Sequence, residues 1–261
     1  MVGIPPAVRV FHATGSYPVQ VESGLVSRLP ALAAELLPGR RLVVITDRTV
    51  GRAVPHQLNV PTLVVAPGEA SKTRARWKAL TDRMLDLGFG RDAAIVALGG
   101  GVVGDLAGFV AATYLRGIPW LSVPTSLLAM VDASVGGKTG VNTSHGKNLV
   151  GAFHPPTAVL ADPSVLGTLH PSHLGAGLVE AIKHGLVADA EYFRWIADRT
   201  DAIVALDPAA LTELVARSAR IKAAVVGADE REHGRRALLN AGHTVAHAIE
   251  LVTDYGILHG D

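Results

Sequence analysis

Short runs of apolar, often β-branched residues recur along the first 160 residues of the chain. The runs at 41–46, 62–66 and 93–98 read RLVVIT, TLVVA and AAIVAL, and each ends in turn-forming residues. Two further runs follow at 120–123 and 158–161. The segments between them have helical spacing, so the pattern predicts a mostly parallel sheet covered by helices on both faces.

Two helices are predicted in particular within this first part. Ser71 can cap a helix that continues to Leu87, with apolar positions at helical spacing. A second, alanine-rich helix follows the glycines at 99–101 and continues to about Thr113.

The pattern changes near residue 162. Strand signals stop, and Ala, Leu, Glu, Lys and Arg dominate segments with a period of 3.6 residues, which Pro171 and Pro208 punctuate as breaks or helix starts. We therefore predict an α/β + all-α chain, with an α/β domain at 1–161 and a helical domain at 162–261.

Composition narrows the range of functions. The 261 residues are 49% apolar and 18% charged with a net charge of +1, which favours a compact fold and gives no general attraction to nucleic acid or anionic lipid. There are no cysteines, so any metal must be held by His, Asp or Glu. The first residues lack a signal-peptide pattern, and the apolar runs are too short to span a membrane. We expect a cytoplasmic enzyme without nucleic-acid or membrane partners, although these bulk properties would suit a binding module equally well.

A glycine-rich turn follows the run at 93–98. Residues 99–104 (GGGVVG) satisfy G-x-G-x-x-G between a predicted strand and a predicted helix, a setting in which backbone N–H groups can bind a phosphate. The turn is not in the first strand–helix unit, and no acidic residue follows about 20 positions later to bind a ribose. Nucleotide binding and tight helix–strand packing both remain open.

A second glycine-rich segment spans 132–148 (DASVGGKTGVNTSHGKN). It is not a Walker A motif, because Asp132 stands where that motif requires glycine. Its polar members include Lys138, Asn142, Lys147 and Asn148. Glycines, lysines and amides suit a phosphate or polyol ligand, so we expect a binding loop; the alternative is an ordinary solvated loop.

Polar side chains also lie within apolar helical segments. Arg236, Asn240, His243 and His247 are spaced to share one face of a helix predicted over 236–251. They suit a site in which the two histidines could share a metal; hydrogen-bonded core histidines are the alternative.

Single charges occur in two more helical segments. Glu180 precedes Lys183 within LVEAIKHGLV, and Lys222 lies within RIKAAVV. A carboxylate in apolar surroundings must be paired or bound to a metal, whereas a surface ion pair is the ordinary alternative for Glu180 and Lys183.

Together these motifs are similar to a known family. GGGVVGDLAGFVAATYLRG, VPTSLLAMVDASVGGKTGVN, GKNLVGAFHPP, EAIKHGL and LNAGHTVAHAIE occur in this order and resemble the 3-dehydroquinate synthases, which are sugar-phosphate cyclases. The resemblance implies a Rossmann-like NAD-binding domain followed by a helical domain that holds a divalent metal, Zn²⁺ or alternatively Co²⁺. It implies conversion of 3-deoxy-D-arabino-heptulosonate 7-phosphate to 3-dehydroquinate and phosphate, by transient oxidation, β-elimination and aldol closure in the shikimate pathway.

The resemblance also implies roles for residues in contact with metal and substrate. The metal ligands are Glu180, His243 and His259, which replaces the pairing of His243 with His247. His247 instead helps to move the proton of the hydroxyl being oxidised. The residues that bind the substrate phosphate are Lys138, Asn148 and Arg236, with Arg116 reaching in from the partner of a homodimer. The residues that hold the carboxylate, hydroxyls and ring are Asp132, Lys183, Lys222 and Asn240.

The same resemblance implies how NAD is held. The residues on the adenosine side are Asp47, Glu69 and Lys72. Those around the pyrophosphate and nicotinamide are Gly101, Val102, Asp105, Thr125, Ser126, Lys138 and Lys147.

Three alternatives to this activity stay open. One is a cyclase for another sugar phosphate, of the 2-deoxy-scyllo-inosose or valiolone type, and another is a metal- and NAD-dependent polyol dehydrogenase. The third arises because the family continues beyond the motif at 258–260 with further helices, including a lysine that contacts the phosphate. We expect this chain to lack that segment, and an inactive, shortened homologue is therefore the third alternative.

Overall fold

The computed structural model describes residues 8–229 and the separate positions 234, 239, 241–242, 246, 249 and 252–253. The helix predicted over 236–251 and the site residues assigned beyond position 229 therefore lie outside the described residues. Those residues are Arg236, Asn240, His243, His247 and His259.

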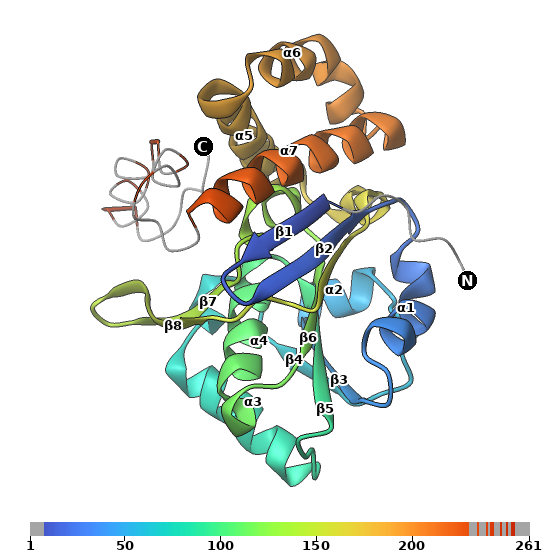
Figure 1. The fold of residues 1–261 in the computed structure, drawn as a ribbon, viewed down its shortest axis with the longest axis vertical. Coiled ribbons are helices and arrows are strands. Elements are labelled where there is room, and N and C mark those ends of the chain that lie inside the picture. Colours follow the sequence, from blue (N-terminus) through green and yellow to red (C-terminus); the bar gives the residue numbers. More distant parts are fainter. Residues whose placement is uncertain are drawn as a thin grey trace.

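A seven-stranded sheet forms the centre of the described part (Figure 1). Its strands, in spatial order, are β1 (Val8–His12), β2 (Gly15–Val21), β9 (Ala158–Ala161), β6 (Trp120–Pro124), β5 (Ala93–Gly99), β3 (Arg41–Asp47) and β4 (Thr62–Val65). β1 and β2 form an antiparallel hairpin, and every other neighbouring pair is parallel. The five strands predicted from the sequence are confirmed, whereas β1 and β2 were not predicted.

Helices cover both faces of this sheet, as predicted. α3 (Arg74–Asp86) and α4 (Gly101–Thr113) pack on one face, and α1 (Leu29–Leu36) and α2 (Arg48–Ala53) lie on the other (Figure 1). The central strands alternate between the two cores: Ile95 packs with α3 and α4, whereas Val96 packs with α1. Strands that are buried on both sides explain the uninterrupted apolar runs in the sequence.

Three long helices follow the last strand of the sheet. They are α5 (Pro171–Ala188), α6 (Ala190–Val204) and α7 (Pro208–Ala228), and the two prolines occupy first-turn positions, as the sequence predicted. Buried apolar residues of α6 and α7 belong to the same core cluster as residues of α1 and of the sheet. The boundary proposed between residues 161 and 162 stays a prediction.

Short helical turns complete the described elements. They are η1 (Val26–Arg28), η2 (Glu69–Ser71), η3 (Tyr114–Arg116), η4 (Ala129–Ala133) and η5 (Pro163–Thr168), of which η4 is a π-helical turn. None of the helices in the described residues is both long enough and apolar enough to cross a membrane.

Two local predictions were wrong. Ser71 does not cap α3: its hydroxyl donates to the carbonyl of Ala66, and the Thr73 hydroxyl instead accepts the hydrogen bond from the backbone N–H of Arg76. The segment at 132–148 is not a loop throughout. It leaves η4 and becomes a β-hairpin of β7 (Lys138–Thr143) and β8 (Gly146–Phe153), which packs on α4.

Candidate functional site

The direction in which the chain crosses the sheet reverses between β3 and β5. From β3 the chain crosses outward through α2 to β4, whereas from β5 it crosses in the opposite direction through α4 to β6. Parallel sheets bind ligands at the carboxyl edge where the direction of crossing reverses. Asp47 ends β3 and Gly99 ends β5, so the site is expected beside these two residues.

The glycine turn at the end of β5 opens directly into α4. A Cβ on Gly99 would lie 2.5 Å from the Cβ of Val103, so only glycine allows this turn to fold so closely against the helix. Gly101 and Val102 form the first turn of α4, where backbone N–H groups and the helix dipole favour an anion. Tight packing and anion binding are thus compatible at this turn.

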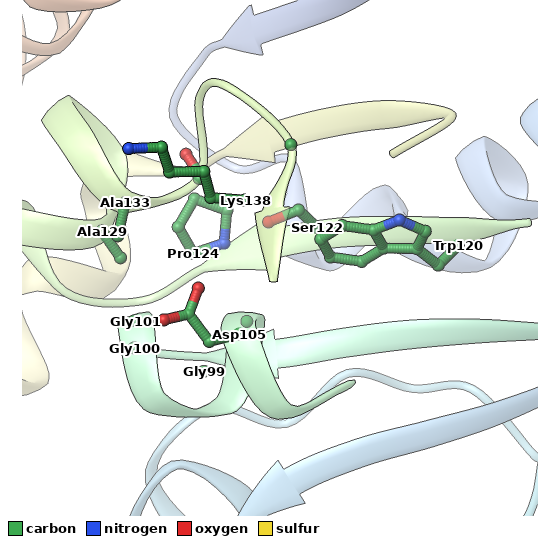
Figure 2. Close-up of a pocket in the computed structure, with 13 residues that line it drawn as sticks. Gly99, Gly100, Gly101, Asp105, Trp120, Ser122, Pro124, Ala129, Ala133 and Lys138 are labelled. Carbon is green, nitrogen blue, oxygen red and sulfur yellow. The ribbon is translucent and has the colours of Figure 1, made fainter. Parts of the chain in front are cut away.

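A small, partly open pocket lies above this turn (Figure 2). The glycines of the turn, Asp105 of α4, Pro124 of β6 and Lys138 of β7 all line it. In Figure 2 the Asp105 carboxylate and the Lys138 side chain lie on opposite sides of Pro124. The pocket therefore brings together residues from the two glycine-rich segments of the sequence.

A buried ion pair lies beside the pocket. The ammonium of Lys72, in the segment after β4, contacts a carboxylate oxygen of Asp105, and only 5% of the Lys72 side chain is exposed. Burial raises the pKa of Asp105, although the neighbouring ammonium of Lys72 opposes that shift. Lys222 of α7 is a further cation whose charge acts on Asp105. The pair joins two residues that the sequence assigned separately to NAD binding.

The β7–β8 hairpin is tied to the same segment. The side-chain amide of Asn142 donates to Glu69 Oε1 at 2.7 Å, and the backbone N–H of Asn142 donates to the carbonyl of Lys72 at 2.8 Å. The side-chain oxygen of Asn142 accepts from the backbone N–H of Asn148 at 3.0 Å. The hairpin therefore holds residues of the predicted phosphate site against residues of the predicted NAD site.

Asp132 occupies the π-helical turn η4, a kind of irregularity that is frequent at functional sites. Its carboxylate lies 2.5 Å from Lys222 Nζ and 3.7 Å from His184 Nε2. Burial alone would raise the pKa of Asp132, but the charge and hydrogen bond of the Lys222 ammonium, together with the neighbouring His184 imidazole, hold it well below its usual range. Asp132 is therefore an anion at neutral pH.

Glu180 reaches this cluster from α5. Only 4% of the residue is exposed, and its carboxylate forms an ion pair with Lys183. A Cβ on Gly177, one turn earlier, would lie 2.5 Å from the backbone nitrogen of Leu128, so glycine lets α5 approach the chain just before η4. The surface ion pair considered from the sequence is wrong, because Glu180 is buried and only 12% of the Lys183 side chain is exposed.

His184 was not singled out in the sequence, yet it belongs to this cluster. It is completely buried, and neither of its ring nitrogens has a hydrogen-bond partner among the described residues. Ligand atoms of Asp132, Glu180 and His184 all lie within 4.8 Å of one another. The sequence does contain a signal, since Glu180 and His184 are four residues apart and share one face of an otherwise apolar helix.

Four more residues of the predicted NAD site lie on three different segments of the structure. Thr125 and Ser126 follow β6 beside the glycine turn, and the backbone N–H of Thr125 donates to the carbonyl of Gly99. Lys147 lies near the hairpin tip, on β8. Asp47 is the N-cap of α2, accepting from the backbone N–H groups of Thr49 and Val50.

Arg116 lies away from the pocket, because it follows the C-terminal end of α4. The 13 residues of that helix separate it from Gly101 by about 20 Å along the helix axis. The structure therefore does not bring Arg116 to the pocket of its own chain.

These donors fit both groups that the sequence implies. A buried carboxylate beside a buried imidazole is a suitable part of a zinc or cobalt site, in which oxygen and nitrogen ligands are usual. Glycines that would meet a neighbour if they carried a Cβ, at the N-terminus of a helix and at a switch point, suit a dinucleotide pyrophosphate.

Comparison with known proteins gives consistent matches. A family model described as 3-dehydroquinate synthase N-terminal matches residues 62–176, and one described as 3-dehydroquinate synthase C-terminal matches residues 177–261. The chain is 49% identical over 255 residues to 3-dehydroquinate synthase of Symbiobacterium thermophilum, a match that covers 94% of this chain and 71% of that protein.

Solved structures of related cyclases share the fold. A 2-deoxy-scyllo-inosose synthase with carbaglucose-6-phosphate, NAD⁺ and Co²⁺ has a TM-score of 0.87 at 28% identity, covering 98% of this chain and 71% of that one. A 2-epi-5-epi-valiolone synthase from Streptomyces hygroscopicus with NAD⁺ and Zn²⁺ has a TM-score of 0.84 at 34% identity, covering 94% and 70%.

Proposed function

Since this chain belongs to the 3-dehydroquinate synthase family, we propose that the residues around Asp132 and the glycine turn carry out the reaction of that family. The chain is an NAD- and metal-dependent lyase that converts 3-deoxy-D-arabino-heptulosonate 7-phosphate to 3-dehydroquinate and phosphate. One observation carries the assignment of the site: two largely buried acid–lysine pairs join η4, α5 and α7, and η4 contacts the N-terminus of α4 at the switch point of a parallel sheet.

NAD occupies the carboxyl edge of the sheet in this proposal. The turn at Gly101 and Val102 binds the pyrophosphate through backbone N–H groups, with Thr125 and Ser126 beside it. The residues on the adenosine side are Asp47, Glu69 and Lys72, and those nearer the nicotinamide are Asp105, Lys138 and Lys147. The Lys72–Asp105 pair keeps two charged groups of the pocket in fixed positions before ligand arrives.

The metal is held by Glu180 together with His243 and His259, of which only Glu180 is among the described residues. A bound NAD would supply a reversible hydride acceptor, and a bound divalent metal would supply a Lewis acid for the substrate hydroxyl that is oxidised. Glu180 is suited to this role because it is buried, charged and on a helix that Gly177 fixes against the sheet domain. His247, in the same proposal, moves the proton of that hydroxyl.

The substrate carries two anionic groups, and the site offers separate cations for them. Lys138, Asn148 and Arg236 bind the phosphate, which leaves as an anion, so cations there stabilise the charge that develops. Lys183 and Lys222 bind the carboxylate and hydroxyls, and each is already oriented by an acidic neighbour. Asp132 and Asn240 hold the hydroxyls and the ring region.

Arg116 is proposed to complete the phosphate site of a partner in a homodimer. The backbone supports a constrained role, because Leu115 and Arg116 both adopt positive φ, at 49° and 69°, before Gly117. Such strain persists where the surroundings fix it, commonly at functional positions. We also propose a cytoplasmic location, because the curated relatives that this chain matches are biosynthetic enzymes.

Phosphate release from the seven-carbon substrate tests the activity. The chain with NAD and Zn²⁺ should release phosphate from 3-deoxy-D-arabino-heptulosonate 7-phosphate, and chelator should abolish that release. NADH should not accumulate, because the cofactor is regenerated in every turnover. Net formation of NADH would instead identify a dehydrogenase.

Other sugar phosphates separate the cyclases from one another. Glucose 6-phosphate and sedoheptulose 7-phosphate lack the carboxylate that we propose Lys183 and Lys222 bind, so neither should be turned over. Phosphate release from either one, with none from the carboxylated substrate, would overturn the assignment in favour of a 2-deoxy-scyllo-inosose or valiolone type of cyclase.

A further inference from the structure

Asn142 lies between the two halves of the proposed site without belonging to either. Its side chain is half-buried near the end of β7, and both of its amide atoms are engaged by different segments. The amide nitrogen donates to Glu69, and the amide oxygen accepts from the backbone of Asn148. Glu69 belongs to the proposed NAD site and Asn148 to the proposed phosphate site.

The chemistry of the partners fixes the orientation of this amide. An ionised carboxylate can only accept a hydrogen bond, and a backbone N–H can only donate one. The Asn142 Nδ2 must therefore face Glu69, at 2.7 Å, and Oδ1 must face Asn148, at 3.0 Å. Because the amide is planar and rigid, a movement of the Glu69 carboxylate turns the group that holds Asn148.

The backbone at both ends of this bridge is constrained. Asn148 has φ of 56°, a left-handed conformation that the hydrogen bond to Asn142 helps to hold. On the other side, the backbone N–H of Asn142 donates to the carbonyl of Lys72 at 2.8 Å, and the residue pairs with Thr73 in a parallel bridge. Those backbone contacts survive a change of the side chain, so the hairpin stays docked when only the amide is altered.

We infer that Asn142 is a positioning residue that couples occupancy of the NAD site to the geometry of the phosphate-binding hairpin. The inference rests on the proposed function, because that proposal assigns NAD to Glu69 and phosphate to Asn148. Binding of NAD orders Glu69, the amide transmits that order to the hairpin, and phosphate binds more tightly as a result. By reciprocity, phosphate tightens NAD binding by the same factor.

Calorimetric titration of the 261-residue chain with NAD, with and without saturating inorganic phosphate, measures this coupling directly. In the unaltered chain phosphate should tighten NAD binding by at least about 5-fold, the lower end of typical couplings. In Asn142→Ala that factor should fall to about 1, and NAD alone should bind about 10-fold more weakly through loss of a hydrogen bond to a charged group.

Asn142→Asp separates the two arms of the bridge. The variant keeps an acceptor for Asn148 but places a carboxylate against that of Glu69, so NAD affinity should fall by more than about 10-fold while phosphate affinity stays within about 2-fold. If Asn142→Ala does not fold, the inference is tested by Asn142→Asp alone, through the loss of NAD affinity relative to the loss of phosphate affinity.

Thr139→Val is the matched control. It removes another side-chain hydrogen bond of the same hairpin, from Thr139 Oγ1 to the carbonyl of Ala152, without touching Glu69 or Asn148. NAD affinity and coupling should both be unchanged in it. Coupling that persists in Asn142→Ala, coupling absent from the unaltered chain, or an equal loss in Thr139→Val would each overturn the inference. A chain that shows the coupling but releases no phosphate from substrate would overturn only the proposed activity.

Discussion

Glu180 is the described residue on which the metal assignment depends most. Replacing it in Glu180→Gln keeps the size of the side chain but removes the charge that a divalent cation requires. We expect affinity for Zn²⁺ to fall by at least about 100-fold, the upper range seen even for indirect partners of metal ligands. Equilibrium dialysis against buffered zinc measures this loss without depending on turnover.

Glu213→Gln provides the control for that experiment. Glu213 forms an ion pair with Arg217 along the partly exposed face of α7, so the same chemical change is made away from the cluster. Its zinc affinity should match that of the unaltered chain. If Glu180→Gln also binds zinc normally, Glu180 is no ligand, and its burial reflects only the pairing with Lys183.

Asp132 gives a prediction about stability and pH. In Asp132→Asn the ammonium of Lys222, a residue that is only 6% exposed, loses its anionic partner, so the free energy of unfolding at pH 7 should fall by about 3 kcal/mol. Because the pKa of Asp132 is lowered by folding, its contribution is fully present above the unfolded-state pKa. It should begin to disappear below about pH 4 and be lost once the pH falls through the folded-state pKa.

Urea unfolding of the unaltered chain and of Asp132→Asn between pH 7 and pH 2 checks this dependence of stability on pH. The gap between their unfolding free energies should be constant at neutral pH and close only in acid. Glu35→Gln, a change at an exposed position of α1, should show almost no gap at any pH. A gap for Asp132→Asn that stayed constant down to pH 2 would contradict the ion-pair explanation.

At the level of the elements, the site depends on how closely α5 approaches η4. In Gly177→Ala the added methyl would sit 2.5 Å from the nitrogen of Leu128, so the helix must move. We expect a loss of about 1–3 kcal/mol in unfolding free energy, as for other overpacked positions. Because Glu180 lies one turn further along, kcat/KM should fall more than stability alone explains, when measured well below the melting temperature.

The same helix supplies a control. A Cβ on Gly175 meets nothing within 4 Å, so Gly175→Ala should stabilise the chain by about 0.5–1 kcal/mol through the helix preference of alanine. Its kcat/KM should be unchanged. Equal effects of the two substitutions would show that the close contact at Gly177 does not position Glu180.

The sequence predicted those elements whose patterns are strong. Strands buried on both faces, such as β3 and β5, have long apolar runs, and Pro171 and Pro208 mark helix starts reliably. The β7–β8 hairpin was missed because glycine, lysine and asparagine are more typical of loops than of strands. β2 was missed because it contains Gly15 and Pro18, which are uncommon in strands; Pro18 is tolerated because it lies outside the part of β2 that pairs with β9.

The site was predicted less completely, for a physical reason. Motifs identify single residues, whereas pairings such as Lys72 with Asp105 or Lys222 with Asp132 join positions 33 and 90 residues apart. No local pattern encodes those contacts. His184 lies on the same helical face as Glu180, but its full burial beside Asp132 follows only from the packing of α5 against η4.

For the molecule as a whole, Arg116 is the residue that we propose acts in the site of a second chain. It lies about 20 Å along α4 from the glycine turn of its own pocket, so the proposed contact with phosphate would be made in a partner. In a homodimer each site would combine Lys138 of one chain with Arg116 of the other. Arg116→Ala and Lys138→Ala should each abolish turnover, because both sites of either homodimer then lack a cation.

Mixing the two variants tests whether the site is shared. A mixed dimer has one site that lacks both cations and one that is intact, and random reassociation makes half of the dimers mixed, so about a quarter of the normal turnover should return. The control is Arg116→Ala mixed with Arg116→Ala/Lys138→Ala, in which no site is complete and no activity should return. If the first mixture also stays inactive while chromatography shows mixed dimers, Arg116 does not act across the interface. Its strained turn would then need a different explanation.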